Sequence, residues 1–92
     1  MGMDSVELLV EIEAYFQIEI TNIEAENIVT VSDFQYCILA KLDKLKSAKA
    51  NAPHYEASDV FEILKKIIHQ IQGVPLTKIT LSANIAKDLG VD

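Results

Sequence analysis

The sequence has no arginine and no tryptophan, and only one cysteine, two prolines and three glycines among its 92 residues. A single cysteine cannot form a disulfide within the chain, which is typical of a reducing compartment, so we expect a cytoplasmic location. No apolar run approaches the roughly 20 residues that a membrane-spanning helix needs, so we expect no membrane insertion. The first residues carry no basic charge, and we therefore expect no secretory signal peptide.

Basic residues are also missing from the first part of the chain. Residues 1–40 contain eight acidic residues and no lysine, whereas residues 41–92 contain six acidic residues and all eight lysines. The two parts therefore carry formal charges of −8 and +2, within a net charge of −6. A nucleic-acid-binding surface needs cations that displace the counterions of phosphate, and the acidic part offers none. We expect no nucleic-acid partner, and we expect basic surfaces of other proteins instead.

Apolar residues recur at helical spacing in four segments and predict an all-α fold of four helices, one of them short, around one core. Asp4 and Glu7 have the spacing of a capping box and predict a first helix over residues 5–17. The apolar stripe of this helix consists of Leu8, Leu9, Ile12, Tyr15 and Phe16. Thr21 and Glu24 have the same cap spacing and predict the short second helix.

Two longer helices and a linker account for the rest of the chain. Ser32 is predicted to cap the third helix, whose apolar stripe comprises Phe34, Ile38 and Leu42, with Cys37 beside them. Residues 47–57 lack helical periodicity and are rich in small residues, which predicts a linker. Ser58 is predicted to cap the last helix, and Gly73 to end it in the left-handed conformation. In the loop that follows, Ser82 is predicted to cap a short turn.

The residue pattern points away from catalysis. His54 lies in the predicted linker and His69 on the polar side of the last helix, and neither has a ligand-like spacing to Cys37. The sequence contains no glycine-rich phosphate loop and no calcium-binding loop, so we expect no metal site. Cys37 lies on an apolar helix face and is predicted to be a small core residue. We therefore expect a binding protein and not an enzyme.

Two parts of the chain resemble the acyl carrier protein family, but in reversed order. Residues 58–92 resemble the family's first helix and long loop through Val60-Phe61-Glu62-Ile63-Leu64-Lys65-Lys66-Ile67-Ile68, Gly73-Val74 and Asp88-Leu89-Gly90-Val91-Asp92. Residues 1–46 resemble its second to fourth helices through Met3-Asp4-Ser5-Val6-Glu7-Leu8-Leu9-Val10-Glu11-Ile12-Glu13-Ala14-Tyr15-Phe16, Glu19-Ile20, Glu24-Ala25-Glu26-Asn27-Ile28 and Thr30-Val31. This order implies a circular permutation within one domain, in which the linker 47–57 joins the family's original ends.

The resemblance implies a prosthetic group and an attachment site. In the family, a phosphopantetheinyl transferase attaches 4′-phosphopantetheine to a serine that directly follows an Asp-Leu-Gly-x-Asp motif, and the group carries acyl chains as thioesters. In this chain the motif ends at Asp92, and the helical register places the family's serine at Gly2, which has no hydroxyl. Ser5 follows Asp4 near the helix start and is the remaining candidate for attachment, with Asp4 and Asp92 as its acidic neighbours. The alternative is that Ser5 is an ordinary residue of the first helical turn.

The resemblance also implies a recognition helix and an acyl pocket. The first helix corresponds to the family's acidic recognition helix, and its candidate partner-binding residues are Asp4, Glu7, Glu11 and Glu13. The expected partners are basic surfaces of acyl-transfer enzymes or of enzymes of fatty-acid and polyketide synthesis. The candidates to line an acyl pocket are Leu9, Ile12, Phe16, Ile28, Ile38 and Ile68, which can equally be packed core residues.

Two functional interpretations remain open at this point. The first is a permuted acyl-carrier-like protein whose attachment serine is either Ser5 or lost at the permutation site. The second is an unmodified helical protein-interaction module, or a permuted folding unit without carrier activity. The sequence is compatible with a monomer and with a dimer that exchanges segments across the linker.

Overall fold

The described residues form four α-helices and one 3-10 turn in the structure, which is a computed structural model. It describes the backbone of residues 3–48 and 54–90, and the side chains of residues 6–46 and 54–90. The helices are α1 (Met3–Phe16), α2 (Asn22–Glu26), α3 (Val31–Ala48) and α4 (Ala57–Gln72), and the 3-10 turn is η1 (Leu76–Lys78). The predicted all-α fold with four helices, one of them short, is confirmed.

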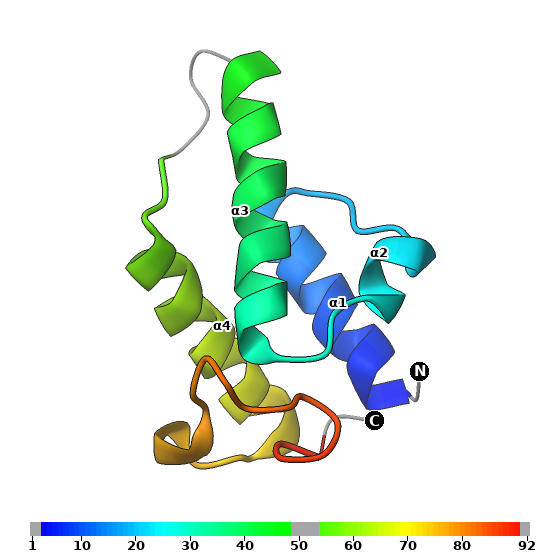
Figure 1. Cartoon of the computed structure of the whole chain (residues 1–92), viewed down its shortest axis with the longest axis vertical. Coiled ribbons are helices and arrows are strands. Elements are labelled where there is room, and N and C mark those ends of the chain that lie inside the picture. The colour runs from blue at the N-terminus through cyan, green and yellow to red at the C-terminus, as the bar shows by residue number, and fades with distance from the viewer. Residues whose placement is uncertain (1–2, 49–53, 91–92) are drawn as a thin grey trace.

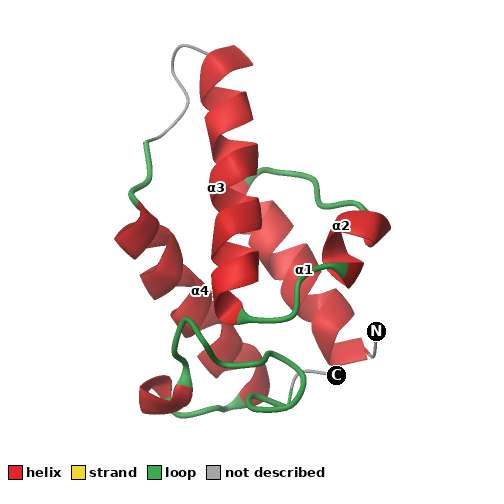
Figure 2. Cartoon of the chain, in the orientation of Figure 1, coloured by secondary structure: helices red, strands yellow, loops and turns green. Residues whose placement is uncertain are grey.

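The three long helices pack together, and a long loop closes one end of the bundle (Figure 1). Helix α4 contacts both α1 and α3, and the loop over residues 73–90 returns from the end of α4 to the start of α3. Backbone pairs fix this loop in place: the N–H of Val31 donates to the carbonyl of Ala83 at 3.0 Å, and the N–H of Ile85 donates to the carbonyl of Val29 at 2.9 Å. Figure 2 shows the loop as irregular chain over most of its length.

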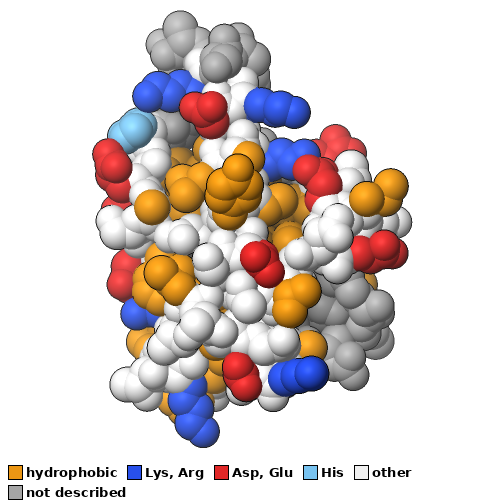
Figure 3. All heavy atoms as spheres, viewed as in Figure 1, with side chains coloured by type: hydrophobic (Ala, Val, Ile, Leu, Met, Phe, Trp, Pro, Cys, Tyr) orange, Lys and Arg blue, Asp and Glu red, His pale blue; other side chains and the backbone are white. Residues whose placement is uncertain are grey.

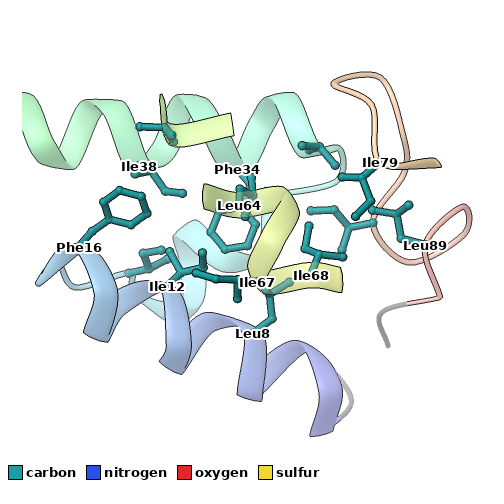
Figure 4. Close-up of a cluster of buried hydrophobic side chains, with 14 of the residues drawn as sticks. Leu8, Ile12, Phe16, Phe34, Ile38, Leu64, Ile67, Ile68, Ile79 and Leu89 are labelled. Atoms are coloured by element: carbon teal, nitrogen blue, oxygen red, sulfur yellow. The ribbon is translucent and has the colours of Figure 1, made fainter. Parts of the chain in front are cut away.

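One hydrophobic core joins the helices and the loop (Figure 4). Each long helix contributes a stripe of buried residues at helical spacing: Leu8, Ile12 and Phe16 from α1; Val31, Phe34, Ile38 and Leu42 from α3; Val60, Leu64, Ile67 and Ile68 from α4. The loop adds Ile79, Ala83, Ile85 and Leu89. A fully buried aliphatic side chain contributes about 1.5–3 kcal/mol relative to an exposed one, so the loop is a structural part of the domain.

The starts of α1 and α3 differ from the predictions. Helix α1 begins at Met3, so Asp4 lies within its first turn and not before it. Helix α3 begins at Val31, and its cap is Thr30 instead of Ser32: Thr30 Oγ1 accepts the N–H of Asp33 at 3.2 Å, and the Asp33 carboxylate accepts the N–H of Thr30 at 3.0 Å. The loop carbonyls satisfy the next free N–H groups of α3, including that of Ser32 at 2.9 Å. A tertiary contact therefore sets this helix start, and the local sequence pattern does not show it.

The cap of α4 and the linker bounds are also corrected. Helix α4 begins at Ala57, where the N–H of Glu56 donates to the Asp59 carboxylate at 3.0 Å, so Ser58 lies inside the first turn. Helix α3 continues to Ala48, so positions 47, 48 and 57 of the predicted linker are helical. Residues 49–53 of that linker lie outside the described residues.

The turn near the end of the loop is capped by Asn84, and the prediction of Ser82 is wrong. The Asn84 side-chain oxygen accepts the N–H of Lys87 at 2.8 Å, and the N–H of Asn84 donates to Asp88 at 2.8 Å. Ser82 instead lies near the Thr80 hydroxyl at 3.5 Å. Asn84 can cap because its amide oxygen reaches the N–H three residues ahead.

Two other predicted boundaries are confirmed, whereas the end of α1 differs by one residue. Thr21 and Glu24 form a complete capping box at the start of α2, and Gly73 ends α4 with φ of 70°. Gln17 ends α1 with φ of 56°, and the N–H of Ile18 donates back to the carbonyl of Glu13 at 3.1 Å. This closure satisfies a free carbonyl at the helix end, and it places the end one residue earlier than predicted.

Tyr15 was predicted to belong to the buried stripe of α1, and this prediction is wrong. The side chain is 54% exposed, although its ring packs edge-on against Phe16 with centroids 5.1 Å apart. Buried positions in α1 follow a spacing of four, and Tyr15 lies beside that stripe. Among the described residues, no helix combines the length and apolar character that crossing a membrane requires.

Candidate functional site

The candidate attachment site lies at the start of α1. Because α1 begins at Met3, Ser5 is in the first turn of the helix. The side chains of Asp4 and Ser5, together with all of Gly2 and Asp92, lie outside the described residues. Nearby, Leu8 of α1 and Leu89 of the loop are both buried in the common core, and Figure 4 shows Ile68 of α4 between them.

The solvent side of α1 combines acidic and apolar residues. We call it the α1 outer face, and it comprises Val6, Glu7, Val10, Glu11 and Ala14, all of them exposed. Val6 and Val10 are 51% and 55% exposed, one helical turn apart, and Glu7 and Glu11 form a parallel row beside them. The structure therefore brings two of the predicted partner-binding residues together on one open surface.

Glu13, a third predicted partner-binding residue, is engaged within the chain. Its carboxylate accepts the backbone N–H of Ile20 at 3.0 Å, and the residue is only partly exposed. Glu13 therefore holds the loop after α1 in place, and it is less available to a partner than Glu7 and Glu11. The fourth candidate, Asp4, lies in the helix with its side chain outside the described part.

Most of the candidate acyl-pocket residues are packed core residues. Ile12, Ile38 and Ile68 are fully buried, and Phe16 is 4% exposed. Leu9 is partly buried and packs against this core. Ile28 differs from the others because it is partly buried and lines a surface groove.

This groove lies between α2 and α3 and has a volume of about 500 Å³. We call it the α2–α3 groove. Its apolar lining includes Ile28, Cys37, Ala40 and the ring of Tyr36, and its charged lining comprises Glu24, Asp33, Lys41 and Lys44. Figure 3 shows hydrophobic side chains gathered over α3, with basic and acidic side chains around them.

An ion pair spans the groove and ties α2 to α3. Lys41 Nζ lies 2.8 Å from Glu24 Oε1 and 2.7 Å from Oε2, so it binds both carboxylate oxygens. The hydrogen bond from Lys41, together with those from the backbone and side chain of Thr21, lowers the pKa of Glu24 to about 2. The same hydrogen bond raises the pKa of Lys41. Both groups are therefore charged and mutually neutralised at neutral pH.

Asp33 is also satisfied within the chain. Its carboxylate accepts the N–H of Thr30 at 3.0 Å and that of Val29 at 3.1 Å, and these hydrogen bonds lower the pKa of Asp33. Lys44 differs, since it makes no ion pair with any described residue. Among the described residues that line the α2–α3 groove, Lys44 is therefore the cation available to a ligand or partner.

The remaining chemically reactive side chains show no catalytic arrangement within the described residues. Burial raises the pKa of the half-buried Cys37 thiol, which keeps it in its less reactive neutral form. His54 is exposed and lies 2.8 Å from the Glu56 carboxylate, and His69 is exposed beside a backbone carbonyl. In residues 3–48 and 54–90, no group of three or more acidic, histidine or cysteine side chains could hold a metal ion.

The sequence patterns did not reveal the α2–α3 groove. Glu24 and Lys41 are 17 positions apart, so no local spacing connects them. A weaker signal was present, because Tyr36 falls on the polar side of α3 and is 76% exposed. A large aromatic residue at such a position can mark a contact surface.

No protein-family model, curated protein or solved structure matches this chain. Function is therefore inferred from the residues and their geometry. Two features of the described part are suited to recognition: the α1 outer face and the α2–α3 groove.

Proposed function

We propose that this chain is an acyl-carrier-like domain with a circularly permuted order of elements. In this assignment α4 and the loop 73–90 take the places of the family's first helix and long loop, and α1, α2 and α3 take those of its second to fourth helices. The supporting observation is that both parts of the chain share one core, in which α4 packs against α1 and α3. The half-buried single cysteine is compatible with action in a reducing cytoplasm.

The proposed activity is to carry acyl groups, without catalysing a reaction. A thioester on 4′-phosphopantetheine would hold the cargo, and Ser5 in the first turn of α1 is the candidate attachment residue. The α1 outer face would present Glu7 and Glu11 to basic surfaces of acyl-transfer or fatty-acid and polyketide synthesis enzymes. Opposite charges across such an interface mainly raise the association rate and the selectivity for the partner.

Shelter for an acyl chain would require part of the bundle to move. Helix α2 has five residues and buries only Ala25, and the Glu24–Lys41 pair holds it to α3. Ile28, directly after α2, already opens to the α2–α3 groove. Each methylene sheltered from water contributes roughly 0.8 kcal/mol, so displacement of so short a helix is energetically accessible to a chain of several carbons.

The test is to co-express the protein with a phosphopantetheinyl transferase and to measure its intact mass. Carrier function predicts a mass increase equal to one phosphopantetheinyl group, lost in Ser5→Ala and retained in Ser58→Ala. Ser58 is a matched control because it lies in the first turn of α4. An unmodified protein would refute carrier activity for this chain, and modification that survives Ser5→Ala would refute the assigned site.

The second candidate function is an interaction module without a prosthetic group. Two observations favour it: the family's serine register falls on Gly2, and the α1 outer face exposes Val6 and Val10 beside acidic residues. Such a face can bind a basic partner without modification. This interpretation predicts that a carrier-dependent enzyme with a basic docking patch binds the unmodified chain and that Glu7→Lys with Glu11→Lys abolishes this binding.

A further inference from the structure

The α1 outer face and the α2–α3 groove are complementary in chemistry. On α1, the half-exposed Val6 and Val10 lie beside the exposed Glu7 and Glu11. Helix α1 contains no basic residue that could neutralise these carboxylates. This is the pattern of an acidic amphipathic helix whose second face is available to a groove.

The groove combines an apolar surface with two carboxylates and two lysines, and Lys44 is the lysine that makes no ion pair with a described residue. Its apolar lining includes Ile28, Cys37 and Ala40, together with Tyr36, whose side chain is 76% exposed. Because Lys41 neutralises Glu24 and backbone N–H groups hold Asp33, the charges of these groups are already engaged. The ammonium of Lys44 is left to meet an incoming carboxylate.

The two surfaces also match in length and spacing. One row on α3 has residues at intervals of four: Tyr36, Ala40 and Lys44. A row on α1 has the same interval: Val6, Val10 and Ala14. At a rise of 1.5 Å per residue, each row is about 12 Å long. Rows with this spacing interdigitate in the most common form of helix packing.

The α1 outer face cannot reach the groove of its own molecule. The opposite side of α1 is buried in the core through Leu8, Ile12 and Phe16, and the helix packs against α4, where Glu11 and Ala14 border a hollow. None of the described residues of α1 lines the α2–α3 groove. A contact between the two surfaces therefore requires two molecules.

We propose that α1 of one molecule docks in the α2–α3 groove of a second copy of this chain. Glu7 and Glu11 face Lys44, while Val6 and Val10 pack against Tyr36 and Ala40. The contact is head-to-tail, because different surfaces of the two copies meet. The net charge of −6 and the small contact area keep it weak, with a dissociation constant in the millimolar range. It rests on the same α1 outer face as the proposed function, so self-association and binding of a basic partner compete.

The test uses the unmodified full chain at increasing concentration. We expect backbone amide NMR signals of residues 6–11 and 36–44 to shift together, along one saturable curve, as unlabelled protein is added to ¹⁵N-labelled protein. Lys44→Glu should weaken the association at least about fivefold. Lys87→Glu is the matched control, since Lys87 is an exposed lysine outside the groove and the two variants have the same net charge.

A charge exchange between molecules makes the test specific. Glu11→Lys should also lose self-association, but a mixture of Glu11→Lys with Lys44→Glu should regain it. In the mixture the unaltered α1 of Lys44→Glu meets the unaltered groove of Glu11→Lys, and the altered α1 of Glu11→Lys meets the altered groove of Lys44→Glu. The proposal is overturned if no NMR shifts occur up to millimolar protein concentration, or if the shifts arise outside both surfaces. It is also overturned if Lys87→Glu weakens the association as much as Lys44→Glu, or if the mixture fails to associate. Lys44 lies outside α1, which carries the candidate attachment residue Ser5. The phosphopantetheinyl mass increase of Lys44→Glu therefore tests carrier function independently of self-association.

Discussion

Leu89 provides the sharpest test of how the chain closes its core. It lies in the irregular loop after α4, close to the end of the described chain, yet it is only 3% exposed and belongs to the core that includes Leu8 and Ile68. Leu89→Ala removes three carbon atoms, worth roughly 2.4 kcal/mol at about 0.8 kcal/mol for each, and any cavity left behind adds to this cost. We expect a loss of about 2–4 kcal/mol of unfolding free energy.

The assay is urea unfolding followed by circular dichroism, with thermal unfolding as a second measure. A loss of this size lowers the thermal midpoint by roughly 10–25 °C in a domain of this length. Leu81→Ala is the matched control, because Leu81 lies in the same loop and is 43% exposed. We expect that variant to lose less than about 1 kcal/mol. Equal and small losses for both variants would refute the conclusion that the loop is part of the core.

Two further predictions concern charged groups that the structure places in hydrogen bonds. Asp33→Ala should cost about 1 kcal/mol of unfolding free energy, because the N–H groups of Val29 and Thr30 lose their acceptor, whereas Asp43→Ala on the same helix should change it little. The pKa of Asp33 is lowered on folding, so this stabilisation is complete above its ordinary pKa of 3.8 and is lost as the pH falls further. Equal losses of unfolding free energy in Asp33→Ala and Asp43→Ala at pH 7 would contradict the role of Asp33 as a cap. Lys41→Met should move the carboxyl NMR titration of Glu24 upward from about 2 toward 4.5, while Lys44→Met should leave it near 2. The Glu24–Lys41 pair stabilises the fold above pH 4.5, and this stabilisation is lost as the pH falls toward 2. If the titration midpoint of Glu24 is unchanged in Lys41→Met, Lys41 does not cause the low pKa of Glu24.

Local patterns predicted the helices better than they predicted their caps. The stripe that joins Phe34, Ile38 and Leu42 was correct because burial of one helix face imposes a spacing of three and four residues. The cap of α3 was assigned to Ser32 instead of Thr30, since several neighbouring residues can accept the same N–H groups. The backbone of loop residues 81–85, which pairs with the start of α3, decides between them.

The candidate site was predictable only in part, and for a related reason. The exposure of Glu7 and Glu11 follows from the period of α1, whereas the engagement of Glu13 depends on the backbone of Ile20, seven residues ahead. The α2–α3 groove had only a weak counterpart in the sequence patterns, namely the large aromatic Tyr36 on the polar side of α3. Its ion pair joins residues that the chain brings together only when α2 folds back on α3.

The sequence by itself determined the all-α class, the amphipathic stripes and the unequal charge of the two parts, because these depend on residue type and on a spacing of a few residues. The tertiary structure decided that the irregular loop 73–90 enters the core, that Lys41 neutralises Glu24 and that Lys44 remains without an ion pair among the described residues. Each of these depends on distances between residues far apart in the chain. Such distances are set by the packing of the helices, and periodicity within one segment carries no information about them.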